Sequence, residues 1–185
     1  MENTSDLVEF KEFQKIPRLS RDMIITEKID GTNGMVHVSE TGEVRAGSRN
    51  RWITPEKDNF GFAKWVEENK EELKKLGAGY HYGEWWGDGI QRHYGIVGKR
   101  WSLFNLSLWT DDAVRPKCCH VVPELYRGLF NTPIIEQVLN NLKEHGSVAS
   151  PGFMRPEGIV IFHIAKGYLF KKTIEGDDNP KSICK

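Results

Sequence analysis

Short stretches rich in hydrophobic and aromatic residues, one of them alternating strictly with polar residues, predict β-strands along most of the chain. The predicted strands span Met23 to Lys28, Met35 to Ser39, Glu43 to Ala46, Tyr80 to Trp86, Ser102 to Leu108, Ile159 to His163, and Tyr168 to Thr173. Turn signals at Thr41-Gly42 and Lys166-Gly167 join two pairs of these strands into hairpins. The strands are therefore expected to pair mainly antiparallel.

Two segments with helical periodicity complete the pattern. Phe60 to Leu76 places its apolar residues on one side and its charged residues on the other, and glycines follow it. Thr132 to Glu144 begins with Thr-Pro, which suits a first helical turn, and ends before Gly146. Strands outnumber helices, so we expect one antiparallel-rich α+β domain over residues 1–185. Residues 1–20 are expected to be an N-terminal extension and 174–185 a short tail, with no appended second domain.

Composition narrows the class of protein. The 26 basic and 26 acidic residues give a net charge of zero, which argues against a protein that coats nucleic acid non-specifically. No apolar run reaches the roughly 20 residues that a membrane helix needs, and the N-terminus lacks the apolar core of a signal peptide. The three cysteines form no metal-binding or disulfide pattern. We therefore expect a cytoplasmic protein without a membrane partner.

The candidate chemistry begins at Lys28, which ends a predicted strand just before a sharp Asp30-Gly31 turn. A lysine in this position can project its amine into a pocket, but a K-x-D-G match alone occurs by chance in roughly one chain in twenty-five. Four further segments follow it along the chain. They are Gly83-Glu84, the aromatic Phe104, the run Glu157-Gly158-Ile159-Val160, and the lysines Lys171 and Lys172.

The order of these five segments resembles that of the covalent nucleotidyltransferase superfamily, which contains polynucleotide ligases and capping enzymes. The resemblance extends from about Thr26 to Lys172. It implies a ligase adenylation-domain fold, with antiparallel sheets, flanking helices and a nucleotide cleft between the sheets. The continuation of the first motif with Thr32-Asn33, and the run from Gly83 to Arg92, resemble the phage and bacterial type of RNA ligase domain.

The resemblance also implies a role for each residue. Lys28 would attack ATP and carry AMP covalently, Glu157 would help to hold Mg²⁺ or Mn²⁺, and Lys171 would contact phosphate and favour the neutral amine of Lys28. Glu84 would bind the ribose. The remaining expected contacts are Phe104 stacked on adenine, Glu27 beside the base, Arg49 on a phosphate, and Asn33 and Arg92 on nucleic acid. The implied function is ATP-dependent RNA ligation in RNA repair: AMP passes from Lys28 to a 5′-phosphate, and the end is sealed to a 3′-OH.

Several alternatives stay open. Taken singly, Phe104 suits a core position, Glu157 a solvated turn, and Arg49 and Arg92 an exposed loop or rim. The family often has two lysines one residue apart in its last motif, whereas Lys171 and Lys172 are adjacent and must face opposite sides of a strand. We favour Lys171, with Lys181 as a distant substitute.

Alternatives also remain for the function. One is a DNA nick ligase or a GTP-using capping-type enzyme, and another is a degenerate domain that binds nucleotide or nucleic acid without ligation. Ligases of this superfamily usually carry a further domain, so this domain is expected to seal ends poorly by itself. It would then need a partner protein, or act on nicked duplex or tRNA-like ends held by another molecule.

Overall fold

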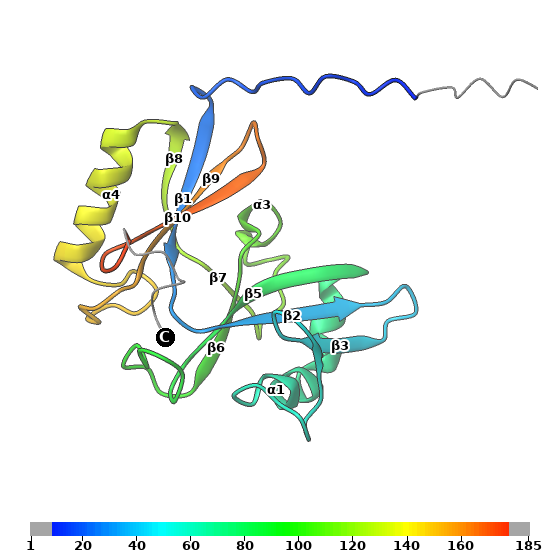
Figure 1. Ribbon diagram of the computed structural model, residues 1–185. Helices are drawn as coiled ribbons and strands as arrows, with labels where there is room; N and C mark the ends of the chain where they lie inside the picture. Colours follow the sequence, from blue (N-terminus) through cyan, green and yellow to red (C-terminus); the bar gives the residue numbers. More distant parts are fainter. Residues whose placement is uncertain (1–8, 178–185) are drawn as a thin grey trace, which may run out of the picture.

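Two β-sheets form the framework of the fold in this computed structural model, which describes residues 9–177 (Figure 1). The first sheet has the strand order β10-β9-β1-β8, and all its neighbours are antiparallel. Its strands are β1 (Asp22–Lys28), β8 (Glu124–Leu129), β9 (Gly158–His163) and β10 (Tyr168–Thr173). Helix α4 (Thr132–His145) packs on one face, because its apolar side forms a core cluster with Met23, Ile25, Ile159 and Ile161.

The second sheet has the strand order β4-β3-β2-β5-β6-β7, in which only β6 and β7 are parallel. Its strands are β2 (Thr32–Val38), β3 (Val44–Gly47), β4 (Trp52–Ile53), β5 (Gly79–Gly87), β6 (Lys99–Leu103) and β7 (His120–Val121). Helix α1 (Phe62–Glu68) covers one face through a core of aliphatic and aromatic side chains that includes Phe62, Trp85 and Trp101. The opposite face carries Tyr80, Tyr82 and Glu84 of β5, because alternate residues of a strand share a face.

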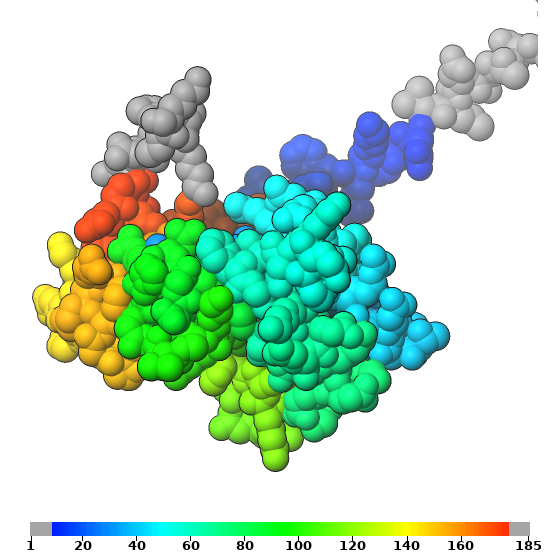
Figure 2. Space-filling model, turned by 90° about the horizontal axis from the view of Figure 1, so that it is seen from below, coloured from blue at the N-terminus to red at the C-terminus, as the bar shows by residue number. Residues whose placement is uncertain are grey.

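A third core cluster joins the two sheets. It contains Ile24 of β1 and Trp86 of β5, together with Ile29, Tyr94, Leu106 and Val122. The segment around residues 90–98 also lies against the segment around 150–156, as the green and orange surfaces show in Figure 2. Ser150 Oγ donates a 2.7 Å hydrogen bond to the carbonyl oxygen of Tyr94 at this contact. The chain passes from the first sheet to the second directly after Lys28, so this lysine lies at their junction (Figure 1).

Most predicted elements are present, and the differences have local causes. The predicted helix over residues 60–76 is divided into α1, α2 (Lys70–Leu73) and the 3₁₀ turn η1 (Lys74–Leu76). The break falls at Asn69, whose side-chain amide bonds the carbonyl oxygen of Trp65 at 2.8 Å and competes with the helical backbone. The predicted strand over residues 102–108 is wrong beyond Leu103, because the short helix α3 (Leu106–Trp109) follows.

The two ends of the chain are described only in part. Residues 9–18 of the expected N-terminal extension contain neither helix nor strand. Residues 1–8, residues 178–185 of the expected tail, and Lys181 with them, lie outside the described residues. Between residues 9 and 177, no helix combines the length and the hydropathy that a bilayer span requires.

Candidate active site

Lys28 and Glu157 form the centre of the site. Lys28 is the last residue of β1, and its direct partner on β9 is Gly158. A Cβ added to Gly158 would lie 2.2 Å from the carbonyl oxygen of Lys172, so the close strand contact requires glycine here. The preceding residue, Glu157, accepts a 2.5 Å charged hydrogen bond from Lys28 Nζ. Both side chains stay partly exposed, at 25% and 19%, so a ligand can reach them.

Glu84 lies across the junction on β5. Its side chain is only 9% exposed, and it accepts hydrogen bonds from the backbone N–H of Gly31 at 3.0 Å and from Asn33 Nδ2 at 3.3 Å. Burial raises the pKa of the Glu84 carboxyl to about 7. The Gly31 N–H and the positive charge of Lys28 oppose this rise, whereas the negative charges of Glu157 and Asp30 add to it. The pKa of the Glu84 carboxyl therefore depends on the charges of Lys28 and Glu157.

The Asp-Gly turn after Lys28 is held on both sides. Asp30 Oδ2 pairs with Arg92 Nε at 2.9 Å, and the Asp30 backbone N–H donates to the Tyr94 hydroxyl at 2.8 Å. Arg92 also donates from Nη1 to the carbonyl oxygen of Arg155 at 3.1 Å. At Gly31, an added Cβ would lie 2.4 Å from the carbonyl oxygen of Trp85. Arg92 thus positions the motif turn, and its expected contact with nucleic acid stays a prediction.

A hollow of about 230 Å³ adjoins Glu84 and collects several expected site residues. It is lined by Asn33, Gly34, Met35, Ser48, Arg49, Tyr82, Gly83 and Phe104. Phe104 follows the end of β6 instead of lying mid-strand, and its ring is 44% exposed, so a core position is excluded for it. Arg49 is exposed at the rim of the same hollow. The structure therefore brings Asn33, Arg49 and Phe104 together beside Glu84.

Glu27 is placed elsewhere. It lies next to Lys28 on β1, so the two side chains point to opposite faces of the strand. Glu27 is 1% exposed, and its oxygens accept hydrogen bonds from Ser147 Oγ at 2.6 Å and from the N–H groups of Val148 and Ala149 at 2.8 Å each. Burial raises the pKa of Glu27, and these donors oppose the rise. Glu27 thus ties the segment after α4 to β1, and its expected place beside the base stays a prediction.

The register of the first sheet separates the two adjacent lysines of β10. Lys171 is opposite Val160, which is opposite Thr26, and these residues share the face of Lys28. Strand geometry places the Cα atoms of Lys171 and Lys28 about 12 Å apart, near enough for both amines to reach one phosphate chain. Lys172 faces α4, where its Nζ pairs with Glu136 at 3.1 Å. The preference for Lys171 over Lys172 agrees with this register.

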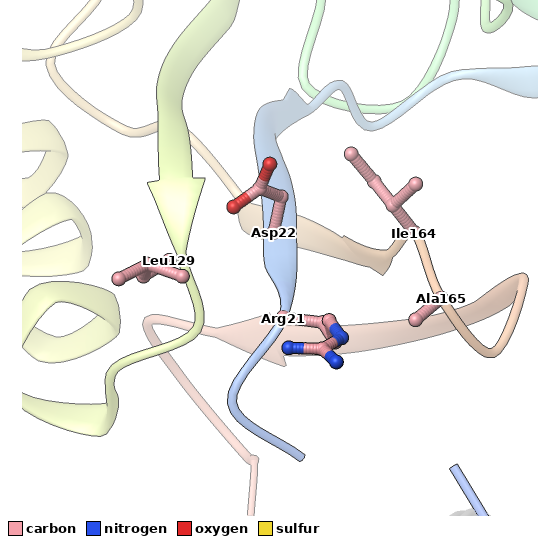
Figure 3. Close-up of a pocket in the computed structure, with 5 residues that line it drawn as sticks. All are labelled: Arg21, Asp22, Leu129, Ile164 and Ala165. Carbon is pink, nitrogen blue, oxygen red and sulfur yellow. The ribbon is translucent and has the colours of Figure 1, made fainter. Parts of the chain in front are cut away.

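A second and larger hollow lies far from these residues. Its volume is about 340 Å³, and it is lined by Arg21, Asp22, Leu129, Ile164 and Ala165 (Figure 3). It surrounds the start of β1, whereas Lys28 ends that strand about 20 Å away by strand rise. None of the expected site residues lines it.

Comparison with known proteins decides the family. The sequence model of the family described as RNA ligase matches residues 21–173, which contain the whole site. The chain belongs to the RNA ligase family. No curated protein sequence matches it.

Solved RNA ligases share the fold. One variant of Naegleria gruberi RNA ligase with ATP and Mn has a TM-score of 0.68 at 19% identity, covering 85% of this chain and 51% of that chain. A second variant with AMP and Mn has a TM-score of 0.64 at 19% identity, covering 84% and 50%. This RNA ligase family member thus spans about half the length of the Naegleria structures, and the ligase adenylation fold expected from the sequence is confirmed.

Sequence reasoning missed the residues that support the site. Tyr94, Ser147 and Arg155 act only through contacts distant in sequence, so no local pattern indicates them. Tyr82 was within reach of sequence reasoning, because it lies two residues before Glu84 on a strand and so shares its face.

Proposed function

We propose that this chain is the nucleotide-transferring domain of an ATP-dependent RNA ligase, with Lys28 as the nucleophile. The observation that carries the proposal is the Lys28–Glu157 pair at the junction of two sheets, whose charges act on the Glu84 carboxyl. Gly83, next to Glu84 in the chain, lines the hollow together with Phe104. The ATP and Mn of the Naegleria structures, which share the fold, support the choice of nucleotide and of a divalent metal. Membership of the RNA ligase family supports RNA as the acceptor.

The first step forms one bond and breaks another. Lys28 Nζ attacks the α-phosphorus of ATP, an N–P bond forms, and the bond to the bridging oxygen breaks as pyrophosphate leaves. The amine must be neutral and unpaired to attack, whereas its Nζ is paired with Glu157 at 2.5 Å. Glu157 must therefore release Lys28 when ATP binds, and the proton of the amine can pass to water, because both side chains are partly exposed.

The other residues position the nucleotide. Phe104 offers an exposed ring for the adenine, and Glu84 offers carboxylate oxygens for the ribose hydroxyls. Arg49 at the rim and Lys171 on the Lys28 face supply positive charge for the phosphates and for the charge that grows on them in the transition state. AMP then passes from Lys28 to a 5′-phosphate, and a 3′-OH displaces it to form the phosphodiester.

The donor set fits Mg²⁺ or Mn²⁺ shared with a nucleotide. Among residues 9–177, no group of three or more His, Cys, Asp and Glu side chains is arranged around a metal position. Mg²⁺ is commonly held by one or two carboxylates together with substrate phosphates, so Glu157 with ATP suffices. When bound, the metal would supply positive charge that stabilises the phosphate oxygens in the transition state.

The decisive experiment follows AMP itself. The protein is incubated with Mg²⁺ and ATP labelled at the α-phosphate, then denatured and separated by electrophoresis. We expect label on the wild type, none on Lys28→Ala, and none when labelled GTP replaces ATP. Labelling by GTP alone would favour the capping-type alternative. If neither nucleotide labels the folded protein, the remaining alternative is a degenerate domain that binds nucleotide or nucleic acid without ligation.

The acceptor and the surroundings are part of the same proposal. We propose RNA ends as acceptors, either in nicked duplex or tRNA-like, and a role in RNA repair. Because the chain spans half of the Naegleria structures, a further domain or partner protein is proposed to help to hold the RNA. We also propose a reducing, cytoplasmic location, because the three cysteines of the sequence form no disulfide pattern. A nicked RNA duplex and the matching DNA duplex, given to the AMP-loaded protein, separate RNA from DNA ligation.

A further inference from the structure

The face of the second sheet opposite α1 carries a group of exposed aromatic rings beside the 230 Å³ hollow described above. Tyr80 and Tyr82 of β5 are 55% and 56% exposed, and Trp52 of β4 is 41% exposed. His37 of β2 lies between them, with its ring centroid 4.5 Å from that of Tyr80 and 6.0 Å from that of Trp52. We call these four residues the aromatic face. Tyr82 also lines the hollow, so the aromatic face continues directly from the site.

Strand register explains why these rings share one surface. Tyr82 is opposite Met35, Met35 is opposite Gly47, and Gly47 is opposite Trp52, which gives one row across four strands. Gly47 leaves the space that Met35 fills, because an added Cβ would lie 2.3 Å from Met35 Cε. In the neighbouring row, Tyr80 is opposite His37. The opposite side of the same strands forms the core under α1, so this surface is not needed to hold the sheet together.

The spacing and charge of the aromatic face suit unpaired nucleotides. The rings of Tyr80 and Tyr82 are 14° from parallel with centroids 6.5 Å apart, so they offer two neighbouring aromatic surfaces of similar orientation on which bases can stack. The guanidinium of Arg45 lies 4.5 Å above the Trp52 ring. Residues 45–51 contain three exposed arginines, Arg45, Arg49 and Arg51, and no acidic residue. Aromatic rings bordered by cations are the usual surface for single-stranded nucleic acid.

We propose that the aromatic face binds the unpaired bases of a single RNA strand and leads that strand toward the hollow and Lys28. The proposal rests on the proposed function for the identity of the strand as RNA. The bases stack on Trp52, Tyr80 and Tyr82, and the arginines of residues 45–51 contact the phosphates. The net charge of zero is no obstacle, because the positive charge is local to this edge of the sheet.

The test measures RNA affinity without ligation. A fluorescent RNA ten-mer with a 5′-hydroxyl cannot accept AMP, and its dissociation constant is measured by anisotropy at low salt. Trp52→Leu and Tyr80→Leu keep apolar bulk but remove the ring, and each is expected to raise the dissociation constant roughly 5- to 100-fold. Tyr80→Phe keeps the ring and is expected to bind as the wild type does. Duplex RNA of the same sequence is expected to respond less, because its bases are already stacked.

The matched control is Tyr168→Leu on β10, since Tyr168 is 56% exposed and has a lysine amine 4.9 Å above its ring. RNA affinity unchanged in both Trp52→Leu and Tyr80→Leu, or lost equally in Tyr168→Leu, would overturn the proposal. The first result is also the one expected if another part of the chain or a second copy covered this face. Crosslinking of wild-type protein to RNA containing 4-thiouridine gives an independent answer: adducts are expected at residues 52 or 80–82, and adducts only elsewhere refute it.

The two proposals fail separately. Labelling of Lys28 with ATP needs no RNA, so Trp52→Leu and Tyr80→Leu are expected to keep it. Loss of RNA affinity with intact labelling supports the aromatic face. A third outcome is a protein that binds RNA through these rings but is never labelled by ATP. This outcome would refute the proposed function and would still support RNA binding by the aromatic face.

Discussion

Replacing Glu84 with glutamine should remove a specific pH dependence of stability. Burial raises the pKa of the Glu84 carboxyl from 4.5 to about 7, so the folded protein favours its neutral form. This group therefore contributes its full stability below pH 4.5 and loses it as the pH rises through about 7. At 1.36 kcal/mol for each pKa unit, the complete loss is about 3 kcal/mol, and most of it falls between pH 5 and 8.

Glutamine has the same shape but no charge, so it can still accept the hydrogen bond from the Gly31 N–H. We expect the variant to gain about 2–3 kcal/mol relative to the wild type between pH 5 and 8. This difference corresponds to about 5–10 °C in melting temperature for a domain of this size. The assay is urea unfolding and thermal melting of both proteins at matched pH values.

Other groups also titrate in this range. Among them are buried Glu27, whose pKa burial raises, and exposed His120, whose pKa partial desolvation lowers. They are common to both proteins, so the difference between wild type and variant isolates Glu84. Lys28→Met should enlarge the effect, because the positive charge of Lys28 lowers the pKa of Glu84. A difference that stays constant from pH 5 to 8 would refute the reasoning, since Glu84 would then be ionised throughout.

Two further predictions concern side chains on opposite faces of the first sheet. Lys171→Ala should slow labelling of Lys28 by ATP roughly 100-fold in single-turnover assays. Lys172→Ala should slow it less than about tenfold, because the side chain of Lys172 faces Glu136. Equal losses in the two variants would contradict the argument from strand register. Ser147→Ala should lower the free energy of unfolding by about 1–3 kcal/mol in urea titrations, because buried Glu27 loses its 2.6 Å donor and the Ser150 N–H loses its acceptor. Under conditions in which the Ser147→Ala variant is folded, ATP should label its Lys28 at the wild-type rate. A loss of labelling without a loss of stability would indicate instead that Glu27 acts in nucleotide binding.

Much of the fold follows from local patterns in the sequence. The hairpin of β9 and β10 and the helix α4 have strong signals, because apolar periodicity, turn residues and helix ends agree there. The sequence signal for strand β8 (Glu124–Leu129) is weaker, because apolar and polar residues do not alternate along it. In the structure its residues are intermediate or exposed, so no buried face marks it. Its place beside β1 depends on pairing with a strand a hundred residues earlier, which no local window contains.

The site shows the same division. Motif order predicted Lys28, Glu84 and Glu157 as site residues, and the structure places the charges of all three within reach of one another. Motif order could not place Glu27, because its partners Ser147, Val148 and Ala149 are more than a hundred residues away. A carboxylate beside a nucleophile looks functional in sequence, and only its burial shows that it holds the backbone.

The sequence by itself determined the residue types that chemistry requires, their order, and the alternation that makes Lys171 and Lys172 face opposite ways. It could not say which of the two faces Lys28, because that choice depends on how β10 is registered against β9 and β1. Nor could it show that Trp52, Tyr80 and Tyr82 share an open surface, since their strands meet only in the folded sheet. Side-chain chemistry is local to a residue, whereas register, burial and charge proximity are properties of contacts between distant segments, and only the tertiary structure decides them.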